Sequence, residues 1–379
     1  MIIITIVLIN NYLSSNTMPN NSKKKIGIIS SGGDCPGLNR VIDSLVRTLD
    51  LEYDIIGFIK GFEGLLDLEY IPLTRNFTGE KRWQSGVYLK SVNHGRFPGK
   101  SKDGVAEINM EVINKAKKNY DDLGLDGIIV IGGDGTLTIA NNLSKFGFRF
   151  IAIPKSIDND LSGTDFTFGF FSAVEVGKQA IINLHSTAFT HDRVIVVELM
   201  GREAGWITLY SGIAAQADVI LIPEIEFSFE NVSKYLKERI AKGKKYALVA
   251  IAEGCSPTDY HQVESEAGND KTQGRLGGIA SELTKYLVEN NENIEVRSLA
   301  LSYLQRSGTA SSYDSFLAMQ FGSYGAKMYR EGKFGQMVSL KNGELTSHPI
   351  EEAVKKLNLV DPNSQVVKLA LDNGIYFGQ

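Results

Sequence analysis

Short apolar runs recur along the chain, and each ends in a polar turn that is rich in glycine or charged residues. Helical patterns of polar and apolar positions lie between these runs. Near-continuous apolar runs are typical of strands that are buried on both faces, as in parallel sheets. We therefore predict seven strands, at residues 26–29, 128–131, 150–153, 194–199, 219–222, 247–252 and 296–301.

The segment after the first run has a helical period. Pro36 suits the first turn of a helix, where a missing N–H costs little. The apolar face of this helix consists of Leu38, Val41, Ile42, Leu45, Val46 and Leu49. Strands that alternate with helices predict an α/β fold with mostly parallel sheets. Ligands of such sheets bind beyond the carboxyl ends of the strands. Because every polar turn lies at such an end, we expect the turns to share one cleft.

The length of 379 residues predicts about two domains. A net charge of −4 and an isoelectric point near 5.9 argue against a nucleic-acid partner, because no basic surplus is available to neutralise phosphates. The two cysteines, Cys35 and Cys255, lie far apart and predict no disulfide framework. This favours a reducing, cytoplasmic location. Cys35 sits in a glycine turn without a histidine nearby, and we interpret it as a small turn residue and not a nucleophile.

The N-terminal segment 1–23 is predicted to be a flexible extension. Its first nine residues are apolar but far fewer than the roughly 20 that cross a membrane. They also lack the basic start and the cleavage site of a signal peptide, so we expect no membrane partner. Met18 precedes a polar stretch and the first strand, which makes it an alternative start.

Two glycine turns are candidates for phosphate binding. The turn 30–37 joins the first strand to a helix, and the turn 132–136, Gly-Gly-Asp-Gly-Thr, has the same arrangement. Glycines allow close backbone approach, and a helix N-terminus favours an anion. Asp134 is suited to hold Mg²⁺ that bridges the phosphates of a donor. Neither a P-loop nor a dinucleotide fingerprint is present. The alternatives are a plain tight turn, or a lipid or NAD kinase, which carry the second motif too.

The segment Ile157-Asp158-Asn159-Asp160 is more specific. One of its two carboxylates is suited to accept the proton of a substrate hydroxyl, and the other to hold a metal or orient its neighbour. A solvated acidic loop is the alternative. Together with the glycine turns, this segment indicates phosphoryl transfer.

In these motifs the chain resembles the 6-phosphofructokinases, over about residues 24–352. The motifs that carry the resemblance are Gly-Gly-Asp-Cys-Pro-Gly-Leu-Asn, Gly-Gly-Asp-Gly-Thr, Ile-Asp-Asn-Asp, Gly-Thr-Asp-Phe-Thr-Phe-Gly-Phe, Glu-Leu-Met-Gly-Arg-Glu-Ala-Gly-Trp and Leu-Gln-Arg-Ser-Gly. The resemblance implies an enzyme that phosphorylates fructose 6-phosphate at its 1-hydroxyl with MgATP, in glycolysis.

The resemblance also implies roles for individual residues. Asp158 matches the base, Arg202 the cation that stabilises the transferring charge, and Ser156 the group beside the phosphoryl. Expected donor contacts are Gly33, Arg96, Gly132, Gly133, Asp134, Gly135 and Thr136, with Asp134 on the metal. Expected sugar-phosphate contacts are Ser156, Ile157, Asp158, Met200, Gly201, Arg202, Glu253, Tyr303 and Arg306, together with Arg193 and Arg297 from a neighbouring subunit.

The implied architecture has two Rossmann-like domains with the active-site cleft between them. The larger, donor-binding domain is expected to span 24–170 plus about 305–355. The smaller, sugar-phosphate-binding domain is expected to span 171–304 plus about 356–379. Since active sites are shared between subunits, the resemblance implies a homodimer or homotetramer.

Two positions give opposite indications about the donor. In the family, Gly follows the metal aspartate in ATP users and Asp in pyrophosphate users, and here this residue is Gly135. Lys155, however, is typical of the pyrophosphate-related branch, and Tyr303 and the 204–206 run also favour that branch. We give Gly135 more weight, because excluding ATP needs bulk and charge that glycine lacks. Pyrophosphate remains the alternative donor.

Three further expectations follow from departures and alternatives. Either Asn93 or Arg96 replaces the donor-binding arginine, and we prefer Arg96 because it carries charge. A non-catalytic regulatory subunit of this fold is expected to lose Asp158 or Arg202, and both are present. Asp43 and Glu69 stand where the bacterial effector site has arginines, so we expect repulsion of a phosphate effector and no ADP or phosphoenolpyruvate control of that kind.

Overall fold

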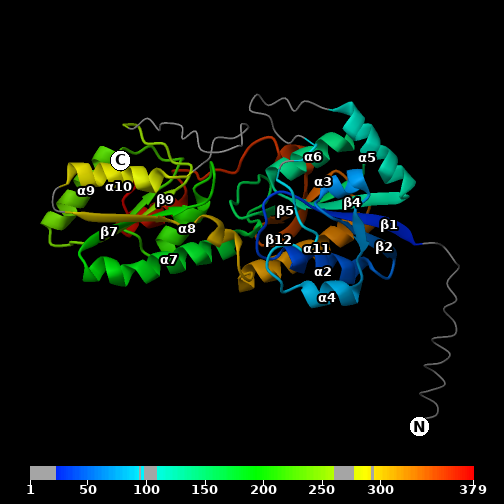
Figure 1. The fold of residues 1–379 in the computed structure, drawn as a ribbon, viewed down its shortest axis with the longest axis horizontal. Coiled ribbons are helices and arrows are strands. Elements are labelled where there is room, and N and C mark those ends of the chain that lie inside the picture. The colour runs from blue at the N-terminus through cyan, green and yellow to red at the C-terminus, as the bar shows by residue number, and fades with distance from the viewer. Residues whose placement is uncertain (1–22, 94, 98–108, 260–276, 292–293) are drawn as a thin grey trace, which may run out of the picture.

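The computed structural model describes residues 23–93, 95–97, 109–259, 277–291 and 294–379. The predicted extension 1–23, apart from Lys23, and the alternative start at Met18 lie outside these ranges. Two sheets, each flanked by helices, form the two halves of an elongated molecule (Figure 1). Within the described ranges no helix combines the length and the apolar character needed to cross a membrane.

The larger sheet has eight strands in the order β12-β11-β5-β4-β1-β2-β3, with β6 paired to β5. Its central strands run parallel, while β3 and β12 are antiparallel to their neighbours. The strands are β1 (Lys24–Ser30), β2 (Tyr53–Phe58), β3 (Tyr70–Pro72), β4 (Leu125–Gly132), β5 (Phe150–Ser156), β6 (Phe168–Gly169), β11 (Gln336–Lys341) and β12 (Glu344–Pro349).

Helices cover both faces of this sheet, which is why its central strands are mostly apolar. Along β4, Ile129 and Ile131 face the core that contains the buried face of α2, while Ile128 and Val130 face the opposite core. Side chains alternate between the two faces of a strand, so a strand buried on both sides needs apolar residues at every position. The helices of this half are α2 (Leu38–Leu49), α3 (Phe62–Asp67), α4 (Arg75–Lys81), α5 (Met110–Asp122), α6 (Asp134–Ser144), α11 (Ser312–Arg330) and α12 (Ile350–Ala353).

The smaller sheet has four parallel strands in the order β10-β7-β9-β8. These are β7 (Arg193–Leu199), β8 (Val219–Leu221), β9 (Ala247–Ala252) and β10 (Glu295–Ala300). The helices around them are α7 (Phe170–Thr190), α8 (Trp206–Ala214), α9 (Phe229–Ala241), α10 (Ile279–Asn290) and α13 (Gln365–Asp372).

All seven predicted strands are present, as is the helix predicted after Pro36, which is α2. The predicted α/β class with mostly parallel sheets is confirmed. The sequence analysis missed β2, β3, β6, β11 and β12, which lie in the larger sheet.

The chain passes between the two sheets three times. It leaves the larger sheet after β6, returns through the short 3₁₀ helix η1 (Ser302–Arg306), and leaves again after α12. The last segment pairs with the smaller sheet through a parallel bridge between Val219 and Tyr376. This distribution supports the predicted domain boundaries, which remain a proposal.

Candidate active site

Three turns meet at the carboxyl edge of the larger sheet, because β1, β4 and β5 are adjacent and parallel. A Cβ atom added to Gly32 would lie 3.2 Å from Oγ1 of Thr136 and 3.5 Å from Nζ of Lys155. The Lys155 ammonium donates a hydrogen bond to the carbonyl oxygen of Gly33. The side chain of Lys155 is buried, and this burial lowers its pKa. The two predicted phosphate turns and Lys155 therefore form one polar cradle.

The second glycine turn opens directly into a helix. Gly133 caps α6, and Asp134 and Gly135 form its first turn. A Cβ atom added to Gly135 would meet no atom within 4 Å outside the local helix backbone. The space beside Gly135, in the first turn of α6, is therefore open, and an anion placed at this helix N-terminus would be favoured by the helix dipole.

The acidic turn after β5 is held by its own side chains. The Ser156 hydroxyl donates to Oδ1 of Asp160 (2.8 Å) and accepts a hydrogen bond from the Asp158 amide (3.1 Å). Asn159 has a left-handed backbone (φ 53°), and its side-chain oxygen accepts from the Thr167 amide (2.9 Å). These contacts fix Asp158 in one orientation.

Asp158 is buried, with 5 % of its surface exposed, and its Oδ1 has no hydrogen-bond partner among the described residues. The pKa of Asp158 is raised to about 7, mainly by burial and also by the neighbouring Asp160, while Arg306 and Arg202 oppose the rise. A carboxylate with one unsatisfied oxygen and a pKa near neutrality has the properties of a general base.

The smaller sheet contributes the loop after β7. Glu253, which follows β9, accepts hydrogen bonds from the amides of Gly201 (3.3 Å) and Arg202 (3.2 Å). Arg202 has a left-handed backbone, with φ of 53°. Such a conformation in a residue other than glycine is uncommon and costs roughly 1–3 kcal/mol. Glu253 therefore holds Arg202 in a backbone conformation that it would not adopt alone.

Arg306 connects the two halves. Its Nη1 donates to the carbonyl oxygen of Asp34 (3.2 Å), and a Cβ atom at Gly33 would lie 2.7 Å from this nitrogen. Gln305 is completely buried and accepts a hydrogen bond from the Met200 amide (2.8 Å). The sequence analysis missed Gln305, although it lies in the quoted Leu-Gln-Arg-Ser-Gly motif. Tyr303, on the same 3₁₀ turn, is 77 % exposed.

Several predicted site residues are thus near one another: the glycine turns, Lys155, Ser156, Asp158, Arg202, Glu253 and Arg306. Ile157 is fully buried, so its backbone alone can face a ligand. Cys35 is also fully buried, and burial raises its pKa to about 12, which fits a turn residue better than a nucleophile.

Arg193 and Arg297 lie elsewhere in the same chain. Both form ion pairs with Glu295, at 2.8 Å and 2.7 Å. Arg193 begins β7, whereas the Arg202 loop follows its end, a separation of about 20 Å at the rise per residue of a strand. Their contribution to the site of a neighbouring subunit remains a prediction.

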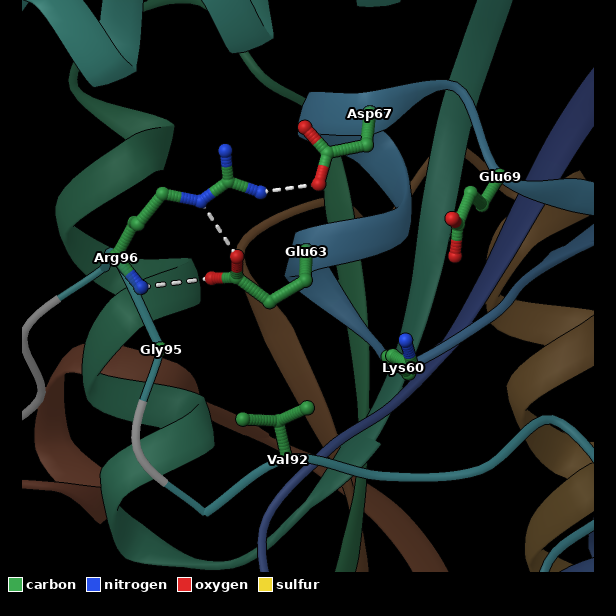
Figure 2. Close-up of a pocket in the computed structure, with 7 residues that line it drawn as sticks. All are labelled: Lys60, Glu63, Asp67, Glu69, Val92, Gly95 and Arg96. Atoms are coloured by element: carbon green, nitrogen blue, oxygen red, sulfur yellow. Dashed lines mark hydrogen bonds and ion pairs between the residues drawn. The ribbon is translucent and has the colours of Figure 1, made fainter.

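Arg96 lines a cavity of about 380 Å³ beside α3 (Figure 2). It forms ion pairs with Glu63 (2.6 Å) and Asp67 (2.5 Å), and its hydrogen bond to Asp67 lowers the pKa of that carboxyl. The cavity is linked to the first glycine turn, because the carbonyl oxygen of Val92 accepts from the Gly32 amide (3.4 Å). The predicted role of Arg96 on a donor phosphate is untested, as is the alternative, Asn93. In this structure the Arg96 charge is already paired.

Asp43, expected to repel a phosphate effector, does not stand alone. Arg47, Arg40 and Arg82 surround it at 2.9, 3.7 and 3.7 Å. The repulsion argument was wrong for this residue, because three positive charges offset its single negative charge. The expected absence of effector control remains untested.

Comparisons with known proteins agree with this geometry. The family model described as Phosphofructokinase matches residues 25–329. ATP-dependent 6-phosphofructokinase 2 of Clostridium perfringens is 39% identical over 359 residues, 93% of this chain and 98% of the relative. Pyrophosphate--fructose 6-phosphate 1-phosphotransferase of Streptomyces coelicolor is also 39% identical, over 93% of this chain and 100% of the relative. The structure of Pichia pastoris phosphofructokinase in the T-state superimposes with a TM-score of 0.75 and 26% identity, over 93% of this chain and 37% of that one.

Proposed function

The chain belongs to the phosphofructokinase family, and from this premise we propose that it transfers a phosphoryl group from MgATP to the 1-hydroxyl of fructose 6-phosphate. The observation that carries the proposal is Asp158. It combines burial, an unsatisfied oxygen and a raised pKa with two cations at the place where the two sheets meet.

The proposed mechanism assigns proton transfer to Asp158 and charge stabilisation to the arginines. The Asp158 carboxylate accepts the proton of the sugar 1-hydroxyl as the hydroxyl oxygen attacks the γ-phosphorus of ATP, and the bond from this phosphorus to the bridging oxygen of ADP breaks. The Arg202 guanidinium offsets the charge that develops on the transferring group. Arg306, supported by Tyr303, binds the sugar's 6-phosphate, since a guanidinium pairs two phosphate oxygens at once. The backbone around Met200 and Gly201 and the Glu253 carboxylate orient the sugar.

Magnesium is proposed to bind together with the donor. Among the described residues, no group of three or more Asp, Glu, His or Cys side chains is placed to hold a metal ion. Mg²⁺ usually binds through one or two carboxylates plus substrate phosphates, and Asp134, in the first turn of α6, fits such a single protein ligand. When bound, the metal neutralises the donor phosphates; Gly33, Gly132, Gly133 and Thr136 line their path.

ATP is the preferred donor because of Gly135. The open space in front of this residue leaves room for a nucleotide's α-phosphate. Two observations favour pyrophosphate as the alternative donor. Lys155 lies in the phosphate cradle, and a 39% identical relative is named for pyrophosphate.

One assay on the purified protein separates the two donors. Fructose 6-phosphate is incubated with Mg²⁺ and either ATP or pyrophosphate, and fructose 1,6-bisphosphate is measured. We expect product with ATP. Product with pyrophosphate alone would overturn the donor assignment, and product with neither would overturn the function.

We also propose a cytoplasmic homodimer or homotetramer whose active sites are shared. Arg193 and Arg297 would bind the sugar phosphate of the neighbouring subunit. Two observations support this: Arg193 lies at the far end of β7 from the Arg202 loop, and both arginines are paired with Glu295 at the start of β10. Mixing Arg193→Ala with Asp158→Ala protein tests this: some mixed sites would then be intact, and activity is expected to return. Continued inactivity of the mixture would contradict sharing.

A further inference from the structure

We propose that Asn358 is a positioning residue, which holds the loop that carries Asp158 against the loop that carries Arg202. Asn358 lies in the third passage of the chain between the two sheets, after α12. The inference rests on the proposed function, because the effect of Asn358 is measured as the rate of the proposed reaction. The residues of the proposed mechanism come from the other parts of the chain, and Asn358 acts through their backbone.

On the side of the larger sheet, Asn358 binds the acidic turn directly. Its side-chain Nδ2 donates to the carbonyl oxygen of Asn159 (2.9 Å), and its amide donates to the carbonyl oxygen of Asp160 (2.8 Å). The preceding residue, Leu357, forms an antiparallel bridge with Leu161. The backbone on the carboxyl side of Asp158 is therefore fixed by Asn358.

On the side of the smaller sheet, the same segment binds the start of α8. The indole Nε1 of Trp206 donates to the carbonyl oxygen of Asn358 (2.7 Å). The Glu224 carboxylate accepts from the amides of both Gly205 (2.9 Å) and Val360 (2.9 Å). Gly205 and Trp206 follow Arg202 by three and four residues, so these bonds anchor the Arg202 loop.

The single residue Asn358 thus forms hydrogen bonds to both the Asp158 loop and the Arg202 loop. Phosphoryl transfer depends on the relative position of the base and the stabilising cation, and a misplacement of about 1 Å can cost about 10²-fold in rate. A link of this kind, a residue that is hydrogen-bonded to both loops, limits the displacement of Asp158 relative to Arg202. It differs from a packing contact, because its loss changes the geometry of the site more than the stability of either half.

The first arm compares Asn358→Ala and Trp206→Phe, each of which removes one hydrogen bond of the link. We expect kcat to fall roughly 10-fold in each, with a smaller change in KM. The double variant should be little worse than either single one, because both act through the same segment. Effects that multiply, or an unchanged kcat, would overturn the proposal.

Matched controls are available for both substitutions. Asn373 also donates its Nδ2 to a carbonyl oxygen, that of Leu369 (2.8 Å), at the end of α13. Trp83 is the other tryptophan and is 62 % exposed. Asn373→Ala and Trp83→Phe should leave kcat unchanged within about twofold, since surface substitutions have small effects. Equal losses in the controls would show that the link has no special role.

The second arm is the pH profile of kcat in Asn358→Asp, which keeps the size of the side chain but replaces the Nδ2 donor with an oxygen facing the carbonyl oxygen of Asn159. The added negative charge is expected to raise the pH midpoint of kcat. The plateau of kcat above that midpoint should nevertheless stay as low as in Asn358→Ala, because the hydrogen bond that positions the turn is lost. A plateau equal to that of the wild type would contradict the proposal.

A third arm needs no substrate. Amide hydrogen exchange of residues 156–162 should accelerate in both single variants and stay unchanged in the controls. If the wild type forms no fructose 1,6-bisphosphate with either donor, the proposed function fails, while this arm still tests the link. Unchanged exchange in both single variants would overturn the inference itself.

Discussion

Two buried aspartates of the larger domain have opposite surroundings. Asp43, on α2, is 1 % exposed and accepts a hydrogen bond from the Thr78 hydroxyl (2.9 Å). Three guanidinium groups, those of Arg40, Arg47 and Arg82, surround it. Its charge is therefore compensated on every side, and it ties α2 to the segment around α4.

Asp158 is almost as buried, but its charge is poorly compensated. One of its oxygens has no partner in the described part of the chain, and a second carboxylate, Asp160, lies beside it. A buried charge without compensation destabilises a protein. The contrast indicates that burial alone does not mark a reactive carboxylate. An unsatisfied oxygen alone does not mark one either, because Asp314 is also buried, with an Oδ1 that has no partner among the described residues. Asp158 differs by lying among the glycine turns, Arg202 and Arg306.

The largest expected effect is on kcat, when each of the two aspartates is replaced by asparagine. Asp158→Asn should lower kcat by about 10²–10⁴, the usual loss when a general base is removed. Asp43→Asn should leave kcat within about twofold, because that carboxylate compensates arginines and lies outside the proposed mechanism. Steady-state kinetics of both variants measures this. Near-wild-type turnover of Asp158→Asn would contradict the mechanism.

The free energy of unfolding should fall more in Asp43→Asn than in Asp158→Asn, the reverse of the order for kcat. Asp43→Asn leaves three arginines without their counter-ion, and we expect a loss of about 2–3 kcal/mol. This is below the roughly 3–5 kcal/mol for a fully buried pair, because the arginines are partly exposed and screened by solvent. Denaturant unfolding at pH 8 measures it. At this pH Asp158→Asn should be more stable than the wild type, and the opposite ranking would refute the comparison.

The pH dependence follows from the raised pKa of Asp158. The base works in its ionised form, so kcat should fall about tenfold per pH unit well below pH 7. The free energy of unfolding has the opposite pH dependence. Because the pKa of Asp158 is higher in the folded protein than in the unfolded chain, protonation of Asp158 stabilises the fold at low pH. This stabilisation is lost as pH rises through about 7.

Asp160→Asn removes a neighbouring negative charge and should move the pH midpoint of kcat downward. The profile of kcat from pH 5.5 to 8.5, recorded for this variant and the wild type, measures the shift. An unchanged midpoint would show that the two carboxylates do not influence each other.

The smallest expected effect concerns the hydroxyl beside Asp43. Thr78→Val removes one hydrogen bond to a charged group and should cost about 1–3 kcal/mol. Activity should be unaffected. Ser156→Ala removes a hydroxyl beside the other aspartate, and there kcat should fall, because the acidic turn loses its contact to Asp160. Equal behaviour of the two variants would weaken the contrast.

The strands that the sequence analysis found and missed differ in a physical way. The seven strands that were found are parallel, and most of them are continuously apolar, although β10 is partly exposed. The parallel strand β2 was missed, because its apolar run is short and the strand begins with Tyr53 and Asp54. The missed β11 and β12 form an antiparallel hairpin at the sheet edge with polar positions. Asn342 and Gly343, both with positive φ, form its turn. An Asn-Gly pair is a strong hairpin signal, so this hairpin was detectable.

The site residues that the sequence revealed and those that it did not reveal also differ in a physical way. The motifs identified the residues after each strand, because parallel strands carry their carboxyl ends to one edge. Gln305 and Asn358 were missed, since each acts by binding backbone groups far away in the sequence. No local pattern encodes such a contact.

The sequence by itself determined the α/β class, the seven buried strands and the chemistry of the turns, because these depend on local periodicity and on residues a few positions apart. It could not distinguish the environments of Asp43 and Asp158, which are single carboxylates in helical and turn patterns. Arg40 and Arg47 lie beside Asp43 at helical spacing, so that part of its compensation is local in the sequence. Only the tertiary structure added Arg82 and a threonine hydroxyl to Asp43 and left Asp158 with an oxygen that is unpaired within the described ranges, because these contacts depend on distances between segments that are remote in the chain.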